Sequence, residues 1–177
     1  HVFRRRQRQM CIRDSTIAYL YETATTMGDS LKTKKDKSPI FLVWAMADAQ
    51  GTNLQRVQII KGWLDNGESK EKVYDATCSD GLEVDKSSHR CPDNGAKVNL
   101  DDCSISKNKG SRELKTLWKD PEFIEDQEAF YYVRVLENPV CRWSTWDAIR
   151  SNQLPRSDIK STIQERAWSS PIWITNY

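Results

Sequence analysis

The sequence predicts a mainly β fold: a β-sandwich-like module of five or six strands with two short helices and long disulfide-stapled loops. Several short runs are rich in β-branched and aromatic residues, which favour strands. An Asn-Gly pair joins two of these runs, and this pair is the strongest short-range signal of a hairpin. Strands and long helices do not alternate along the chain, as a parallel α/β sheet would require.

The first two elements lie before residue 50. Residues 16–26 (TIAYLYETATT) are compatible with a short helix or a strand. Residues 39–48 (PIFLVWAMAD) are continuously apolar, and this pattern predicts a strand that is buried on both faces. The longest apolar stretch, 40–47, is strand-sized and far shorter than the roughly 20 residues of a membrane-spanning helix, so we expect no membrane span.

A hairpin is predicted in the next segment. Residues 54–64 and 72–76 are strand-like and flank Asn66-Gly67, two residues that tolerate positive φ. From 78 to 109 the chain is polar, and a structureless loop of that length is usually functional or stapled.

Four elements are expected in the remainder. Residues 111–119 (SRELKTLWK) carry apolar side chains at positions 114, 117 and 118, the spacing of a short amphipathic helix. Residues 129–137 (AFYYVRVLE) are the clearest strand, and 143–150 (WSTWDAIR) indicate a helical turn. Residues 167–175 (AWSSPIWIT) predict a last strand, which Pro171 places at a sheet edge or interrupts with a bulge.

Residues 1–15 differ from the rest, so we expect two regions: a disordered or artefactual tail (1–15) and a folded module (16–177). Five of the 27 Lys and Arg residues but only one of the 25 Asp and Glu residues lie in the tail, which leaves 22 basic and 24 acidic residues in the module. An arginine-rich arm or an address signal would explain this composition. The string RRRQRQMCIRDS, however, resembles translated sequencing-adapter read-through from metagenomic DNA, so no nucleic-acid partner is expected.

Apart from Cys11 in the tail, the chain has four cysteines: Cys78, Cys91, Cys103 and Cys141. An even number predicts two disulfides in an oxidising compartment, which implies a periplasmic or secreted protein. Three pairings are possible, and we prefer Cys78–Cys91 with Cys103–Cys141 because the first pair brackets one polar loop. Free thiols and a metal site are the alternatives, although no CxxC pair is present.

The sequence carries few catalytic signals. It contains no GxSxG, P-loop, GxGxxG or HExxH motif, and His89 is the only histidine outside the tail, so we assign no catalytic, cofactor-binding or metal-binding residue. Arg142, Trp143 and Trp146 form a candidate recognition surface, because an arginine beside exposed tryptophans supports cation–π contacts.

Five segments together resemble a known family: FLVWAMAD (41–48), LQRVQIIKGW (54–63), EKVYDATCSDG (71–81), AFYYVRVLENPVCRWSTWDAIR (129–150) and TIQERAWSSPIWI (162–174). They resemble the C-terminal part of domain of unknown function 3604, a bacterial family whose longer members look like metal-dependent hydrolases of the polymerase-and-histidinol-phosphatase (PHP) superfamily. The resemblance implies a non-catalytic C-terminal module whose partner is a missing N-terminal barrel of the same chain. The divalent metal is expected in that barrel, because the family's HxH motif has no counterpart here.

Two other interpretations remain open. The chain could be an extracellular ligand- or carbohydrate-binding β-sandwich that uses its Trp/Arg surface, or a self-contained enzyme that uses carboxylates such as Glu137, Asp147 and Glu165. A broad, flat apolar face would favour the module that packs against a barrel. A groove lined by Trp and Arg would favour the binding module, and a pocket with converging carboxylates would favour the enzyme.

Overall fold

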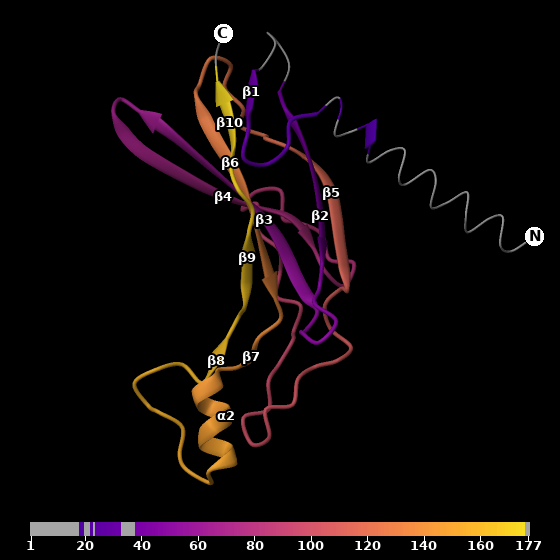
Figure 1. Ribbon diagram of the computed structural model, residues 1–177, viewed down its shortest axis with the longest axis vertical. Coiled ribbons are helices and arrows are strands. Elements are labelled where there is room, and N and C mark those ends of the chain that lie inside the picture. The colour runs from indigo at the N-terminus through magenta and orange to yellow at the C-terminus, as the bar shows by residue number, and fades with distance from the viewer. Residues whose placement is uncertain (1–17, 20–21, 23, 33–37, 176–177) are drawn as a thin grey trace, which may run out of the picture.

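The computed structural model describes residues 18–19, 22, 24–32 and 38–175, and it confirms the mainly β fold (Figure 1). The elements with defined bounds are ten strands and the short helix α2 (Trp143–Arg150), which lies where a helical turn was predicted. The strands are β1 (Ser30–Lys32), β2 (Ile40–Met46), β3 (Leu54–Asp65), β4 (Glu68–Cys78), β5 (Glu113–Lys119), β6 (Ala129–Glu137), β7 (Val140–Cys141), β8 (Thr162–Ile163), β9 (Arg166–Trp168) and β10 (Ile172–Thr175).

Two layers make the fold sandwich-like. The larger is a six-stranded sheet in the order β1-β10-β6-β3-β4, with β9 also paired to β6. The smaller is the antiparallel pair β2–β5, which Figure 1 shows as a separate layer to the right of the larger sheet. The core lies between the layers and consists of Phe41, Val43, Leu54, Val57, Ile59, Leu114, Ala129, Tyr131 and Ile174.

The hairpin prediction is confirmed. β3 and β4 pair in antiparallel, and Asn66-Gly67 joins them with φ values of 51° and 82°. Both values lie in the left-handed region that a two-residue hairpin turn requires. Ala76 is an extra residue in the β4 register, so a bulge bends this long hairpin near its base.

The predicted helix at 111–119 is wrong, because β5 occupies residues 113–119 of that segment. All seven β5 residues pair in register with β2. A helix of this length is marginal by itself, whereas pairing satisfies the hydrogen-bonding edge of β2. Leu114 is buried in the core, while Leu117 is 70% exposed on the other face.

The expectation that residues 39–48 are buried on both faces is also wrong. β2 does form there, and its Phe41 and Val43 point into the core. Its other face remains exposed, with exposed fractions of 67% for Ile40 and 73% for Met46. No element among the described residues therefore covers the outer side of this strand.

The predicted last strand divides at its proline. β9 and β10 both pair with β6, but Ser169, Ser170 and Pro171 lie opposite only two β6 residues, Tyr132 and Val133. The extra residue is a bulge, which was one of the two outcomes expected from Pro171. β10 itself lies between β1 and β6 and is not an edge strand.

Two predictions concern residues that the structure does not describe fully. Within 16–26, the described residues Ala18, Tyr19 and Glu22 are helical, and several others lie outside the described part. The proposed tail, 1–15, lies entirely outside it. In the described ranges no helix is long and apolar enough to cross a membrane.

Candidate functional site

Two disulfides staple the polar excursion that follows β4. Cys78 is joined to Cys91 and Cys103 to Cys141, which is the pairing preferred from the sequence. Their Cα atoms are 5.6 and 5.7 Å apart, within the usual range of about 4.4–6.8 Å. The first bridge closes a loop beside β4, and the second ties the excursion to β7.

A buried carboxylate holds the first loop in place. The side chain of Asp75 on β4 is fully buried and accepts hydrogen bonds from Arg56 Nη1 (2.9 Å), Gln58 Nε2 (2.6 Å) and the backbone N–H of Cys91 (2.6 Å). Arg90 Nη1 lies 3.7 Å from Asp75 Oδ1, the oxygen that accepts from Gln58. Since a buried charge needs such partners, this cluster is a structural anchor for the loop.

A second buried cluster lies between the layers. Lys61 Nζ on β3 donates to Asp120 Oδ2 (2.8 Å) and to the carbonyl of Glu122 (3.0 Å), and the Tyr131 hydroxyl donates to the same Asp120 oxygen (2.8 Å). Burial, followed by the hydrogen bond to Asp120, raises the pKa of Tyr131 far above its ordinary value. Tyr131 therefore stays protonated and acts as a hydrogen-bond donor.

His89 adjoins this cluster at the edge of the sheet. Its ring meets Tyr74 edge-on at 5.3 Å between centroids, and its Nε2 atom lies 3.9 Å from a Glu122 carboxylate oxygen. Lys72 bonds Glu122 and lowers its pKa, while burial chiefly raises the pKa of Tyr74. Tyr74 therefore stays protonated at neutral pH. The side chain of His89 is 26% exposed.

The three carboxylates considered for a self-contained enzyme do not converge on a pocket of the described residues. Glu137 and Glu165 lie close together, because the Glu137 N–H donates to the Glu165 carbonyl at 3.0 Å. Asp147 lies on the exposed side of α2. No group of three or more His, Cys, Asp or Glu side chains in the described ranges is arranged to hold a metal ion.

Glu137 should make stability depend on pH. Burial, with the nearby carboxylates of Glu165 and Asp48, raises its pKa above the ordinary 4.5. The folded state therefore binds this proton more tightly than the unfolded state, so the free energy of unfolding falls as pH rises through 4.5 toward the higher folded pKa. At pH values above this window, we expect Glu137→Gln to raise the thermal midpoint of unfolding. At pH values below the window, the midpoint should not change. A midpoint difference that is the same at acidic and neutral pH would contradict this.

The candidate recognition surface lies at the α2 end of the molecule (Figure 1). Trp143 is 74% exposed, and Trp146 is covered in part by Arg150, whose guanidinium carbon is 5.2 Å from a ring centroid. Arg142 precedes the helix, and its Nε donates to the Lys160 carbonyl at 3.1 Å. The arginine over a tryptophan ring is thus Arg150.

An exposed apolar surface lies on the small sheet. The outward side chains of β2 are Ile40, Leu42, Trp44 and Met46, and Leu117 of β5 lies opposite Leu42. We call these five residues the outer β2–β5 face. Lys115 Nζ lies 5.8 Å from the Trp44 ring centroid and gives this face a polar margin.

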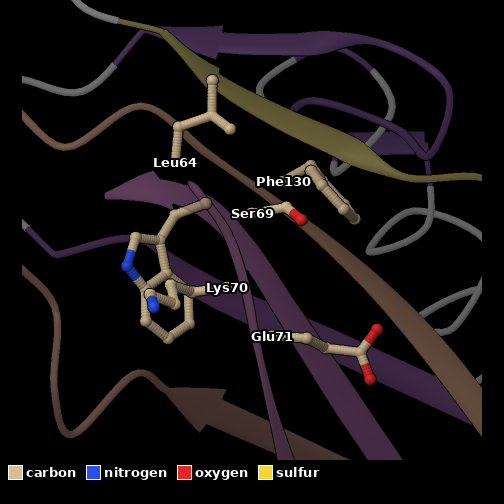
Figure 2. A pocket seen from close by; sticks show the side chains of 6 residues that line it. Leu64, Ser69, Lys70, Glu71 and Phe130 are labelled. Carbon is tan, nitrogen blue, oxygen red and sulfur yellow. The ribbon is translucent and has the colours of Figure 1, made fainter. Parts of the chain in front are cut away.

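The hollows of the described residues are shallow. One, of about 250 Å³, lies at the end of the β3–β4 hairpin and is lined by Trp63, Leu64, Ser69, Lys70, Glu71 and Phe130 (Figure 2). Another, of about 550 Å³, is lined by Ser38, Lys119, Asp120, Pro121, Phe123 and Glu125. In the second, Asp120 is already bonded to Lys61 and Tyr131. Neither hollow has the enclosed, convergent polar lining that is typical of an active site.

The fold and these surfaces define a disulfide-stapled β-sandwich-like module in which the outer side of β2 is apolar and exposed. Over residues 5–176 the chain matches the family described as "Protein of unknown function (DUF3604)", and it belongs to that family. The match begins inside the segment 1–15 that the sequence set apart. No curated protein and no solved structure matches the chain.

Proposed function

We propose that this chain is the C-terminal module of a PHP-like metal-dependent hydrolase and that it docks on the catalytic barrel through the outer β2–β5 face. The proposal combines the family membership with one observation, the exposed apolar side of β2. A strand that is apolar on both faces is typical of a strand covered on both sides. Here Phe41 and Val43 are covered by the core, while Leu42 is 52% exposed.

The chemistry of this face suits a protein surface. Four of its five side chains are aliphatic or thioether groups, and Glu113, Lys115 and Lys119 of β5 stand directly opposite three of the β2 residues. Exposed apolar groups that are bordered by polar residues are typical of protein interaction sites. A flat patch of adaptable Leu, Ile and Met side chains fits a packed domain interface better than a small polar ligand.

In this proposal the reaction belongs to the barrel. The divalent metal and its ligands are supplied there, and no residue of this chain is assigned a catalytic role. Two disulfides are compatible with an extracellular or periplasmic location, and we place the hydrolase in one of these compartments. Residues 1–15 are not part of the folded module in this proposal.

Oxidative footprinting tests the docking surface. The chain alone is compared with a fusion that places the barrel of a longer family member upstream of it. Met46 (73% exposed) and Met27 (64% exposed) form a matched pair, because only Met46 lies on the outer β2–β5 face. We expect Met46 to be oxidised readily in the chain alone and to be protected in the fusion, while Met27 reacts equally in both.

Leu42→Lys in the fusion should expose Met46 again, whereas Leu154→Lys should not, since Leu154 is 93% exposed and lies away from this face. Equal oxidation of Met46 in the chain and the fusion would contradict docking through this face. Phosphoester or carboxylester turnover by the chain alone with added Mn²⁺ or Zn²⁺, lost in His89→Ala, would instead support a self-contained enzyme.

A further inference from the structure

A second exposed surface lies on the other side of the sandwich. Phe130 and Tyr132 of β6, Trp173 of β10 and Trp168 of β9 form what we call the aromatic face. We propose that the aromatic face binds a neutral polysaccharide by stacking on its pyranose rings. This inference does not depend on the proposed docking, because the aromatic face lies on the side of the six-stranded sheet that points away from β2 and β5.

Strand register places the four rings on one surface. Trp173 pairs directly with Phe130, and Trp168 pairs with Arg134. Residues directly opposite in an antiparallel pair share a face, as do alternate residues along a strand. Phe130, Tyr132 and Arg134 alternate along β6 with Tyr131, Val133 and Val135, which lie against the core. The rings therefore point away from β2 and β5.

The rings are held by the sheet and by each other. Phe130 and Tyr132 are nearly parallel, at 13° with 6.3 Å between centroids, and Phe130 lies 5.1 Å from Trp173. Phe130 also lies over Gly62 of β3, where a Cβ atom would collide with its ring. Trp173 and Trp168 nevertheless remain 48% and 59% exposed. A rigid and still accessible set of rings loses little conformational freedom when a ligand stacks on it.

The composition distinguishes this face from the outer β2–β5 face. Its exposed apolar groups are mainly aromatic, whereas those of the outer β2–β5 face are mainly aliphatic. Aromatic rings beside hydrogen-bonding groups suit a ligand that has apolar faces and polar groups around its edge. A pyranose ring has this character, with C–H groups on its faces and hydroxyl groups around its edge.

Polar groups lie beside the rings at suitable positions. Ser30 is opposite Trp173 on β1, and Glu71 is opposite Gly62 on β4. Figure 2 shows Ser69 and Glu71 on the same side of the hairpin as Phe130, whereas Lys70 lies on the other side. The hollow of about 250 Å³ at this end continues the surface toward the hairpin turn. These groups can donate to and accept from sugar hydroxyls.

Charged side chains of both signs lie beside the rings. Glu71 of β4 is negative, and Lys32 of β1, Arg134 of β6 and Arg166 of β9 are positive. The Arg134 Nε already donates to Gln58 Oε1 at 2.7 Å. The rings themselves are uncharged, so stacking on them requires no charge on the polymer. Cellulose, xylan and mannan are therefore the appropriate probes.

The experiment measures depletion of the complete chain from solution by insoluble cellulose, xylan and mannan. We expect retention on at least one of them, little affected by salt because the contact is uncharged. Trp173→Ala should weaken binding roughly tenfold, the loss expected on removing a stacking ring. Trp173→Phe should retain most of it. Trp143→Ala, which removes an exposed tryptophan from α2, is the matched control and should bind like the parent.

Several outcomes would overturn the inference: no retention on any of the three polymers, retention abolished by salt, or equal weakening by Trp173→Ala and Trp143→Ala. Protection of Trp173 from oxidation in the barrel fusion would also overturn it, by making the aromatic face a domain interface. Protection of Met46 in that fusion reports separately on the proposed docking, so failure of one proposal is distinguishable from failure of the other.

Discussion

Asp120→Ala is expected to lower the free energy of unfolding by about 3–5 kcal/mol, the range for removing one partner of a buried ion pair. The side chain of Asp120 is fully buried and that of Lys61 is 4% exposed. The substitution leaves the ammonium group of Lys61 without its carboxylate and the Tyr131 hydroxyl without its acceptor. Urea unfolding of the purified chain measures the change.

Two variants show whether charge is the cause. Lys61→Met combined with Asp120→Leu and Tyr131→Phe should recover much of the lost stability, since this apolar set leaves neither the charge nor the hydroxyl unpaired in the core. Asp158→Ala removes a carboxylate from an exposed pair with Arg156 and should leave the unfolding midpoint unchanged. If Asp120→Ala behaved like Asp158→Ala, the buried pair would not stabilise the fold.

Removing the bridge between Cys103 and Cys141 should be as severe. Loop-closure entropy predicts a loss of about 4 kcal/mol for Cys103→Ser with Cys141→Ser, and about 3 kcal/mol for Cys78→Ser with Cys91→Ser. The bridge between Cys103 and Cys141 is expected to contribute more stability because its cysteines are 38 residues apart, whereas Cys78 and Cys91 are 13 residues apart. Urea unfolding of both double variants measures the order.

Reducing agent supplies the control for these cysteine variants. The unfolding midpoint of the parent chain should fall when its disulfides are reduced. The midpoint of a variant that lacks both bridges should not change when the reductant is added. A parent chain whose unfolding midpoint does not move on reduction would contradict the stabilising role of both disulfides.

Local signals made several parts of the fold predictable. Asn66-Gly67 has the backbone preference of its turn, and the position of Cys78 and Cys91 around one polar loop favoured the pairing that the structure confirms. β5 was misread because the spacing i, i+4 of Leu114 and Trp118 satisfies both a helical stripe and one face of a strand. The exposure of Leu117 on the opposite face separates the two alternatives only once β2 is in place.

The buried charges and the candidate surfaces were harder to foresee. Lys61 and Asp120 are 59 residues apart, so no local pattern links them. A weak signal did exist, since Lys61 and Asp75 each interrupt a strand-like run of apolar residues. The aromatic face depends on the register between β6, β9 and β10, which local sequence does not encode.

The place of β10 in the sheet sets an order of assembly during synthesis. β1 is among the first strands to leave the ribosome, but it joins the larger sheet only through β10, which is made last among the described strands. β3, β4 and β6 can pair beforehand, while β1 waits for a partner far along the sequence. A nascent chain arrested before Ile172 would present part of an unpaired β6 edge, to which other chains could add as strands. Pairing of β10 therefore covers this part of the β6 edge and at the same time provides the partner of β1.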